Sequence, residues 1–147
     1  HITQYIPQYG NIMPVTLLRD ISFGDCDPAG IVFYPNAFRW MDAAFHQLLR
    51  TFGGHAALCE RLGAIGIGLV DVSAQFHKPM HDGDRLDLQV TLADWTSRSV
   101  ALRYEGRIDG TTTFTGREVR CLFSRSETGI VATSVAPLRS LLESPDV

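Results

Sequence analysis

The stretch PNAFRWMDAAFHQLLRTF, residues 35–52, decides the fold because it predicts the one long helix of the chain. Its apolar residues recur every three or four positions, as they do on the buried face of an α-helix. Gly53 and Gly54 follow and are expected to end the helix. A helix with one apolar face must pack against another layer of structure. The residues of that face are Phe38, Met41, Phe45, Leu48, Leu49 and Phe52.

Strand patterns flank this helix on both sides. Before it, residues 15–23 alternate apolar and polar side chains with a period of two. After it, a short helix is expected at residues 55–62, closed by Gly63. Turn sequences such as Asp109-Gly110 separate the segments that follow. These segments are strands at 67–76, 85–95, 99–108 and 112–124, an edge strand at 130–135, and a final helical turn at 137–142.

The order of these elements predicts an α+β fold. Consecutive strands joined by turns are expected to pair as antiparallel hairpins. A meander of four or five strands buries the apolar face of one long helix only if the sheet curls around it. This plan is the hotdog architecture, with an antiparallel sheet of about five strands wrapped around the helix. The large side chains of Trp40, Phe45 and Phe76 are expected in its core.

Length and composition indicate a single intracellular domain. The chain has 147 residues, so we expect one domain over 1–147, with residues 1–11 as an irregular leader. No apolar stretch reaches the ~18 residues of a membrane span, and a net charge of −3 gives no general reason to bind nucleic acid or membranes. The three widely spaced cysteines suggest neither disulfides nor zinc, which favours the reducing cytoplasm.

The segment at residues 23–36 carries most of the candidate chemistry. It places Asp25 and Asp27 after a strand and before the long helix. Aspartate is common in turns and helix caps without any catalytic role, so its presence alone does not decide the function.

A calcium loop is one reading of this segment. Asp25, Asp27 and Gly30 occupy positions one, three and six of the EF-hand pattern. However, Ala29 stands at position five, and Asn36 stands where a bidentate glutamate is required. The loop also follows a strand instead of a helix, which argues against this reading.

Phosphoryl transfer and acyl transfer are the other two readings. Phosphoryl transfer needs a cation for the phosphoryl group and further carboxylates for magnesium, but the only lysine, Lys78, has no acidic pair beside it. Acyl transfer needs a carboxylate that attacks or activates water, beside a helix N-terminus that stabilises the oxyanion. A thioester suits this arrangement because thiolate is a good leaving group. No GxSxG sequence competes with it.

The run FGDCDPAGIVFYPNAFRWMDAA, residues 23–44, closely resembles the opening motif of the Asp-dependent hotdog 4-hydroxybenzoyl-CoA thioesterases. A weaker resemblance continues through SAQFHKPMHDGDRLDLQV, residues 73–90. Together they cover about residues 15–100, while the C-terminal third resembles the family only in its strand pattern. The resemblance implies the hotdog fold and acyl-CoA hydrolysis, and it favours the catalytic reading of the loop.

The resemblance also implies roles for individual residues. Asp27 matches the catalytic carboxylate, as nucleophile or general base, and Tyr34 matches the residue whose backbone N–H polarises the thioester carbonyl. Asp42 matches a position near a hydroxyl on the acyl ring, reached across a subunit interface, although a solvated helix carboxylate is an equal alternative. Where the family carries a cluster of basic residues for coenzyme A phosphates, this chain keeps only Arg98, a candidate phosphate contact or a surface residue.

The sequence therefore predicts a cytoplasmic thioesterase for a small, aromatic acyl-CoA, acting without a metal or another cofactor. The four histidines at 46, 55, 77 and 81 lack paired ligand spacing, so no metal site is expected. The resemblance implies a homodimer or homotetramer. The alternative is a non-catalytic hotdog protein that binds acyl-CoA.

Overall fold

The computed structural model describes residues 13–143, so the predicted leader at 1–11 lies outside the described residues. The described residues form six strands, three α-helices and one short 3-10 helix. The expected elements are all found, with bounds that differ by a few residues. In chain order they are β1 (Val15–Asp20), η1 (Phe23–Asp25), α1 (Pro35–Arg50), α2 (His55–Leu62), β2 (Gly66–Phe76), β3 (Arg85–Trp95), β4 (Val100–Ile108), β5 (Thr111–Ser126), β6 (Gly129–Thr133) and α3 (Ala136–Glu143).

The strands form one antiparallel sheet in the order β1-β3-β4-β5-β2, and β6 pairs with β5. The predicted hairpins are correct for β3-β4-β5 but wrong for β2 and β3. These two strands are not neighbours, because β2 pairs with β5 and β3 pairs with β1. The connection at residues 77–84 is longer than a tight hairpin loop, so it can cross the end of the sheet. As a result β1 and β2 lie at opposite edges.

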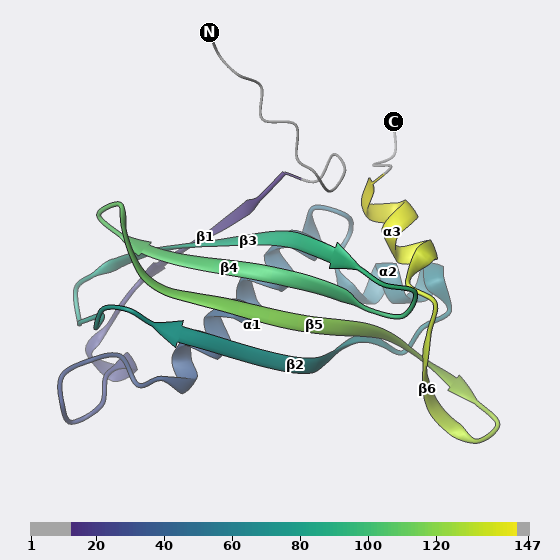
Figure 1. The fold of residues 1–147 in the computed structure, drawn as a ribbon, viewed down its shortest axis with the longest axis horizontal. Helices are drawn as coiled ribbons and strands as arrows, with labels where there is room; N and C mark the ends of the chain where they lie inside the picture. The colour runs from purple at the N-terminus through teal and green to yellow at the C-terminus, as the bar shows by residue number, and fades with distance from the viewer. Residues whose placement is uncertain (1–12, 144–147) are drawn as a thin grey trace, which may run out of the picture.

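Helix α1 packs against one face of this curled sheet, which confirms the predicted hotdog architecture (Figure 1). Pro35 occupies its first turn, where the missing N–H costs no helical hydrogen bond. Trp40 and Phe45 are buried as predicted, whereas Phe38 and Phe52 are only half-buried. The buried residues of α1 are Ala37, Trp40, Met41, Ala44, Phe45, Leu48 and Leu49.

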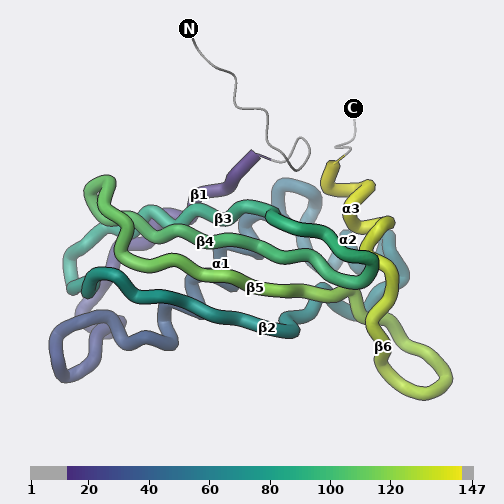
Figure 2. Tube along the Cα trace, in the orientation of Figure 1, coloured from purple at the N-terminus to yellow at the C-terminus, as the bar shows by residue number. Residues whose placement is uncertain are grey.

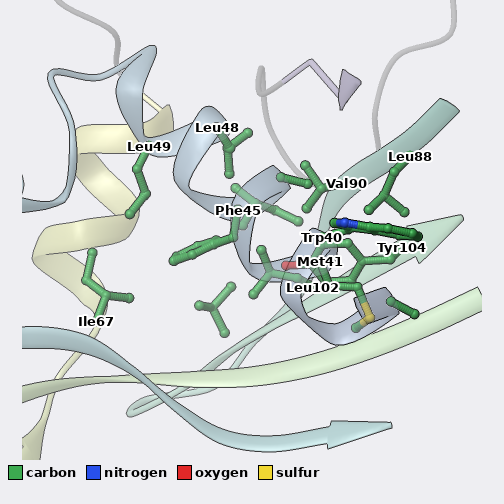
Figure 3. Packing of buried hydrophobic residues seen from close by; sticks show 14 of the residues in the cluster. Trp40, Met41, Phe45, Leu48, Leu49, Ile67, Leu88, Val90, Leu102 and Tyr104 are labelled. Carbon is green, nitrogen blue, oxygen red and sulfur yellow. The ribbon is translucent and has the colours of Figure 1, made fainter. Parts of the chain in front are cut away.

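The core lies between α1 and the sheet (Figure 3). Alternate residues of β3 point into it, including Leu86, Leu88 and Val90, which are fully buried. The helix approaches the sheet closely at Gly116, where a Cβ atom would lie 2.6 Å from Cε of Met41. A glycine at this point of β5 therefore permits the Met41 side chain of α1 to pack against the strand.

The two ends of the sheet differ in what covers them (Figure 2). The loop between β1 and α1 lies near the start of β3, because Asp20 pairs with Arg85. Helices α2 and α3 lie towards the opposite end, where the β3–β4 turn is found (Figure 1). Helix α2 ends as predicted at Gly63, which adopts a φ of 63° in the left-handed region. No helix within residues 13–143 is both long and apolar enough to span a bilayer.

Candidate active site

The loop that carries Asp27 is held by its own backbone. The N–H of Asp27 donates to the carbonyl of Ile31 over 2.9 Å, and the N–H of Gly30 donates to the carbonyl of Asp27 over 2.9 Å. Gly30 has a φ of 81°, a conformation that glycine adopts without strain. Cys26 and Val32 then pair across the loop as an isolated β-bridge. Asp27 thus sits at the tip of a small, well-fixed turn.

The Asp27 side chain is half-buried and has one engaged oxygen. Its Oδ1 accepts a hydrogen bond of 2.9 Å from the backbone N–H of Ala29. Its Oδ2 accepts no hydrogen bond from any residue in the range 13–143. One oxygen therefore orients the carboxylate, and the other is left available for chemistry.

Asp25 has a different role, because its carboxylate stabilises the loop. Both of its oxygens accept hydrogen bonds of 3.0 Å from Nη2 of Arg19, and Oδ2 also accepts one from the N–H of Ser22. Burial alone would raise the pKa of Asp25, but the hydrogen bonds from Ser22 and Arg19 outweigh it and lower the pKa. Asp25 therefore stays ionised and ties the loop to β1.

Tyr34 stands immediately before α1, with its side chain 61% exposed. The nearest backbone N–H groups before and after Tyr34 both have partners. The N–H of Phe33 donates to the carbonyl of Asp25, and the N–H of Asn36 donates to the carbonyl of Phe33. The N–H of Tyr34 itself donates to no group among the described residues. This free donor lies at the N-terminus of α1, where the helix dipole favours negative charge.

A cavity of about 270 Å³ adjoins this helix entry. Its walls are mainly apolar and come from the loop, from Phe76 at the end of β2 and from the connection that follows β2. The prediction that Phe76 lies in the core is wrong, because the side chain is 49% exposed and faces this cavity. A larger hollow of about 580 Å³ lies on the outer face of the sheet and does not include the loop. The lining residues of the smaller cavity are Ile31, Val32, Tyr34, Phe76, His77, Lys78, Pro79 and Met80.

Asp42 lies on α1 and contacts a buried group that the sequence did not reveal. Its Oδ1 accepts a hydrogen bond of 3.0 Å from Nη2 of Arg120 and lies 3.7 Å from Nε2 of His46. The Arg120 side chain is 4% exposed, whereas that of Asp42 is 56% exposed. Arg120 is bound in turn by Glu118, which accepts from Nε at 3.0 Å and from Nη2 at 3.2 Å. The hydroxyl of Tyr104 donates to Glu118 Oε1 at 2.5 Å.

Arg98 lies in the turn between β3 and β4 and is exposed. Its backbone N–H donates to Oγ1 of Thr96, which is an ordinary turn contact. No ion pair holds its guanidinium group among residues 13–143. A phosphate contact by Arg98 stays a prediction.

Asp27 and Tyr34 belong to one loop, whereas the other two predicted residues lie elsewhere in the fold. Asp42 follows Tyr34 by eight residues, or about 12 Å along the helix axis. Arg98 lies at the other end of β3, a strand of 11 residues that spans about 36 Å. Within the described ranges, no three His, Cys, Asp or Glu side chains are placed to share a metal ion.

Comparisons with solved structures agree with this fold. The 4-hydroxybenzoyl-CoA thioesterase of Pseudomonas sp. strain CBS-3 superposes with a TM-score of 0.78 and 27% identity, over 88% of this chain and 98% of that one. A gentisyl-coenzyme A thioesterase superposes with a TM-score of 0.71 and 27% identity, over 84% of this chain and 98% of that one.

Sequence comparisons agree as well. The same Pseudomonas enzyme is 34% identical over 93 residues, which are 61% of this chain and 65% of the relative. A 1,4-dihydroxy-2-naphthoyl-CoA hydrolase of Synechococcus sp. strain WH7803 is 32% identical over 82 residues, 51% of this chain and 54% of the relative. The matched part therefore spans less than two-thirds of these relatives. A family model for the thioesterase superfamily matches residues 29–115, more than half of the sequence. The chain belongs to the thioesterase superfamily.

Proposed function

We propose that this protein hydrolyses the thioester of a small, hydroxylated aromatic acyl-CoA to the free acid and coenzyme A. The observation that carries the proposal is that one loop holds two free groups, a carboxylate oxygen of Asp27 and the backbone N–H of Tyr34, neither of which has a partner among the described residues. A nucleophile or base beside an oxyanion donor is the minimum that acyl transfer requires.

The geometry supports a simple sequence of steps. The thioester carbonyl oxygen accepts from the N–H of Tyr34, and the N-terminus of α1 stabilises the negative charge that develops on it. Asp27 either attacks the carbonyl carbon, giving a mixed anhydride that water then hydrolyses, or removes a proton from the attacking water. In both routes the carbon–sulfur bond breaks and coenzyme A leaves as thiolate. No strong general acid is needed.

Asp42 and the related proteins support the proposed acyl class. The relatives compared above are named for 4-hydroxybenzoyl, gentisyl and dihydroxynaphthoyl thioesters. Asp42 Oδ2 accepts no hydrogen bond from residues 13–143, and the side chain is more than half exposed. A fixed carboxylate with a free oxygen is a suitable acceptor for an aromatic hydroxyl.

The proposal also includes a site built from two subunits, because the family resemblance implies that Asp42 reaches the acyl ring across a subunit interface. Strand β2 is an edge of the sheet, and its Leu69 and Val70 are 47% and 56% exposed. An exposed apolar edge strand is suited to pair with a second copy. We therefore include a homodimer, or a tetramer of two such dimers, in the proposal.

The test is the release of free thiol from a panel of acyl-CoA thioesters by the purified wild-type protein. Turnover of hydroxybenzoyl-CoA above that of aliphatic thioesters supports the proposal. Binding of acyl-CoA without any thiol release would instead establish the alternative, a non-catalytic acyl-CoA-binding protein.

Asp42→Ala should narrow the preference for hydroxybenzoyl-CoA over benzoyl-CoA. The reason is that the variant removes the acceptor of the ring hydroxyl, a hydrogen bond that benzoyl-CoA makes in neither protein. We expect kcat/KM to fall by about tenfold for the hydroxylated substrate and to change little for benzoyl-CoA. An equal loss on both substrates would show that Asp42 does not contact the hydroxyl.

Arg98→Ala should raise KM for an acyl-CoA by several-fold with little change in kcat. A remote phosphate contact is made equally in the ground state and the transition state, so its loss weakens binding only. The control is an acyl-pantetheine thioester, which lacks the nucleotide and should show no difference between wild type and variant. If KM for the full substrate stays the same, Arg98 is only a surface residue.

A further inference from the structure

Glu118 and Arg120 place two charges inside the layer where α1 packs on the sheet. Glu118 is 1% exposed and Arg120 is 3% exposed. Burial alone would lower the pKa of Arg120, but its hydrogen bonds to Glu118 and the charge of that carboxylate raise the pKa. Burial, together with the charge of Glu118, raises the pKa of Tyr104 well above its ordinary value. Arg120 is therefore charged, and the neutral phenol of Tyr104 donates to the Glu118 side chain beside it.

Almost all of the polar atoms in this buried network have hydrogen-bond partners. The guanidinium of Arg120 donates to both oxygens of Glu118, to Asp42 Oδ1 and to the carbonyl of Ile67. One face of it also packs on the ring of Phe45, with 4.0 Å between its carbon and the ring centroid. A buried ion pair is seldom the most stable choice for a core, because apolar residues of the same volume are often as good or better. The burial of this ion pair therefore suggests that it has a functional role.

The network reaches the surface at one group, the carboxylate of Asp42. In the sheet, Arg120 lies opposite Leu69, beside a β-bulge between Leu69 and Asp71 in the edge strand β2. Bulges at sheet edges redirect side chains and occur often beside active sites. Asp42 is thus an exposed carboxylate near the open edge of the sheet. One of its oxygens is held by the buried guanidinium of Arg120.

We propose that Tyr104, Glu118 and Arg120 are positioning residues that hold Asp42 in place to accept a hydrogen bond from the hydroxyl of the acyl group. This inference rests on the proposed function and extends it to residues that do not touch substrate. Tyr104 and Glu118 fix the guanidinium, the guanidinium fixes Asp42 Oδ1, and Oδ2 faces the ligand. The preference for hydroxylated over plain acyl groups should then depend on the buried side chains of Tyr104, Glu118 and Arg120, which do not touch the substrate.

Tyr104→Phe is the main test because it removes one oxygen and leaves the ring in place. We expect it to narrow the kcat/KM ratio of hydroxybenzoyl-CoA to benzoyl-CoA by about three- to tenfold, as for the loss of one hydrogen bond. Arg120→Lys keeps the charge but cannot make the forked contact, so it should narrow the ratio further, towards that of Asp42→Ala. Binding of the non-hydrolysable analogues hydroxyphenacyl-CoA and phenacyl-CoA, measured by calorimetry, should show the same change in ratio.

Thr113→Val is the matched control, because Thr113, on β5, also has a buried hydroxyl, which donates to the carbonyl of Gly106, outside the network. It should leave the substrate ratio unchanged. A general loss of stability would lower activity on both substrates together and would not move the ratio. If Arg120→Lys folds poorly, as judged by its melting temperature, Tyr104→Phe decides the question.

The outcomes separate this inference from the proposed function. If wild type prefers the hydroxylated substrate and Asp42→Ala abolishes the preference, while Tyr104→Phe and Arg120→Lys retain it, the positioning role is wrong and the function stands. If the network variants lose activity equally on both substrates, the role is structural and the inference is again overturned. If wild type shows no preference, the proposed acyl class and the inference fail together.

Discussion

Asp27→Asn should lower kcat by about 10²–10⁴-fold, the contribution that a positioned acid–base group or nucleophile commonly makes. Asparagine has nearly the same shape, and its side-chain oxygen can still accept the hydrogen bond that Asp27 Oδ1 accepts from Ala29. The turn is therefore expected to persist, while the charge that attacks carbon or activates water is lost. The measurement is single-turnover hydrolysis of hydroxybenzoyl-CoA, with circular dichroism to confirm that the variant is folded.

Cys26→Ser supplies the control in the same loop. Cys26 has no part in the proposed steps, and its thiol donates to the carbonyl of Ser22, so the serine variant should retain activity close to wild type. Hydrolysis by folded Asp27→Asn at nearly the wild-type rate would remove the catalytic assignment. Inactivity of Cys26→Ser would indicate that the Cys26 thiol takes part in catalysis.

The parts of the structure that the sequence predicted well are those governed by local rules. Apolar spacing located α1, and the glycine after residue 62 marked the end of α2. Turn residues separated β3, β4 and β5, which pair with their chain neighbours. The Asp27 loop was also recognisable, because its two carboxylates and Gly30 stand together between a strand and a helix.

The errors concern contacts between distant segments. Pairing of β2 with β5 joins residues about 50 positions apart, and no local pattern specifies it. Phe76 looked like a core residue because its place in an apolar alternation does not reveal that its strand ends beside a cavity. Glu118 and Arg120 could have been found: in a strand that alternates faces, they share the side of buried Phe114 and Leu122. That alternation predicts that both charged side chains point into the core. Two charged side chains in the core in turn predict a further polar group that pairs with them.

Arg120→Met should reduce the free energy of unfolding by about 3–5 kcal/mol, because removal of one member of a buried pair leaves the other charge without compensation. Glu118 would keep a hydrogen bond from Tyr104 but lose both of its contacts to the guanidinium. Urea unfolding, followed by fluorescence at one fixed protein concentration, measures the effect, since the stability of an oligomer depends on concentration.

The cause of that loss is tested by removing the stranded charge as well. A triple variant with Arg120→Met, Glu118→Leu and Tyr104→Phe replaces the buried polar groups with apolar ones, and it should recover most of the lost stability. Arg107→Met is the surface control: Arg107 pairs with Glu105 at 2.7 Å but is exposed, so its loss should shift the urea midpoint little. If the triple variant is no more stable than Arg120→Met alone, the destabilisation arises from packing around the arginine stem and not from an uncompensated carboxylate. Recovery of stability without recovery of the preference for hydroxylated substrates would show that the buried charges serve substrate recognition more than the fold.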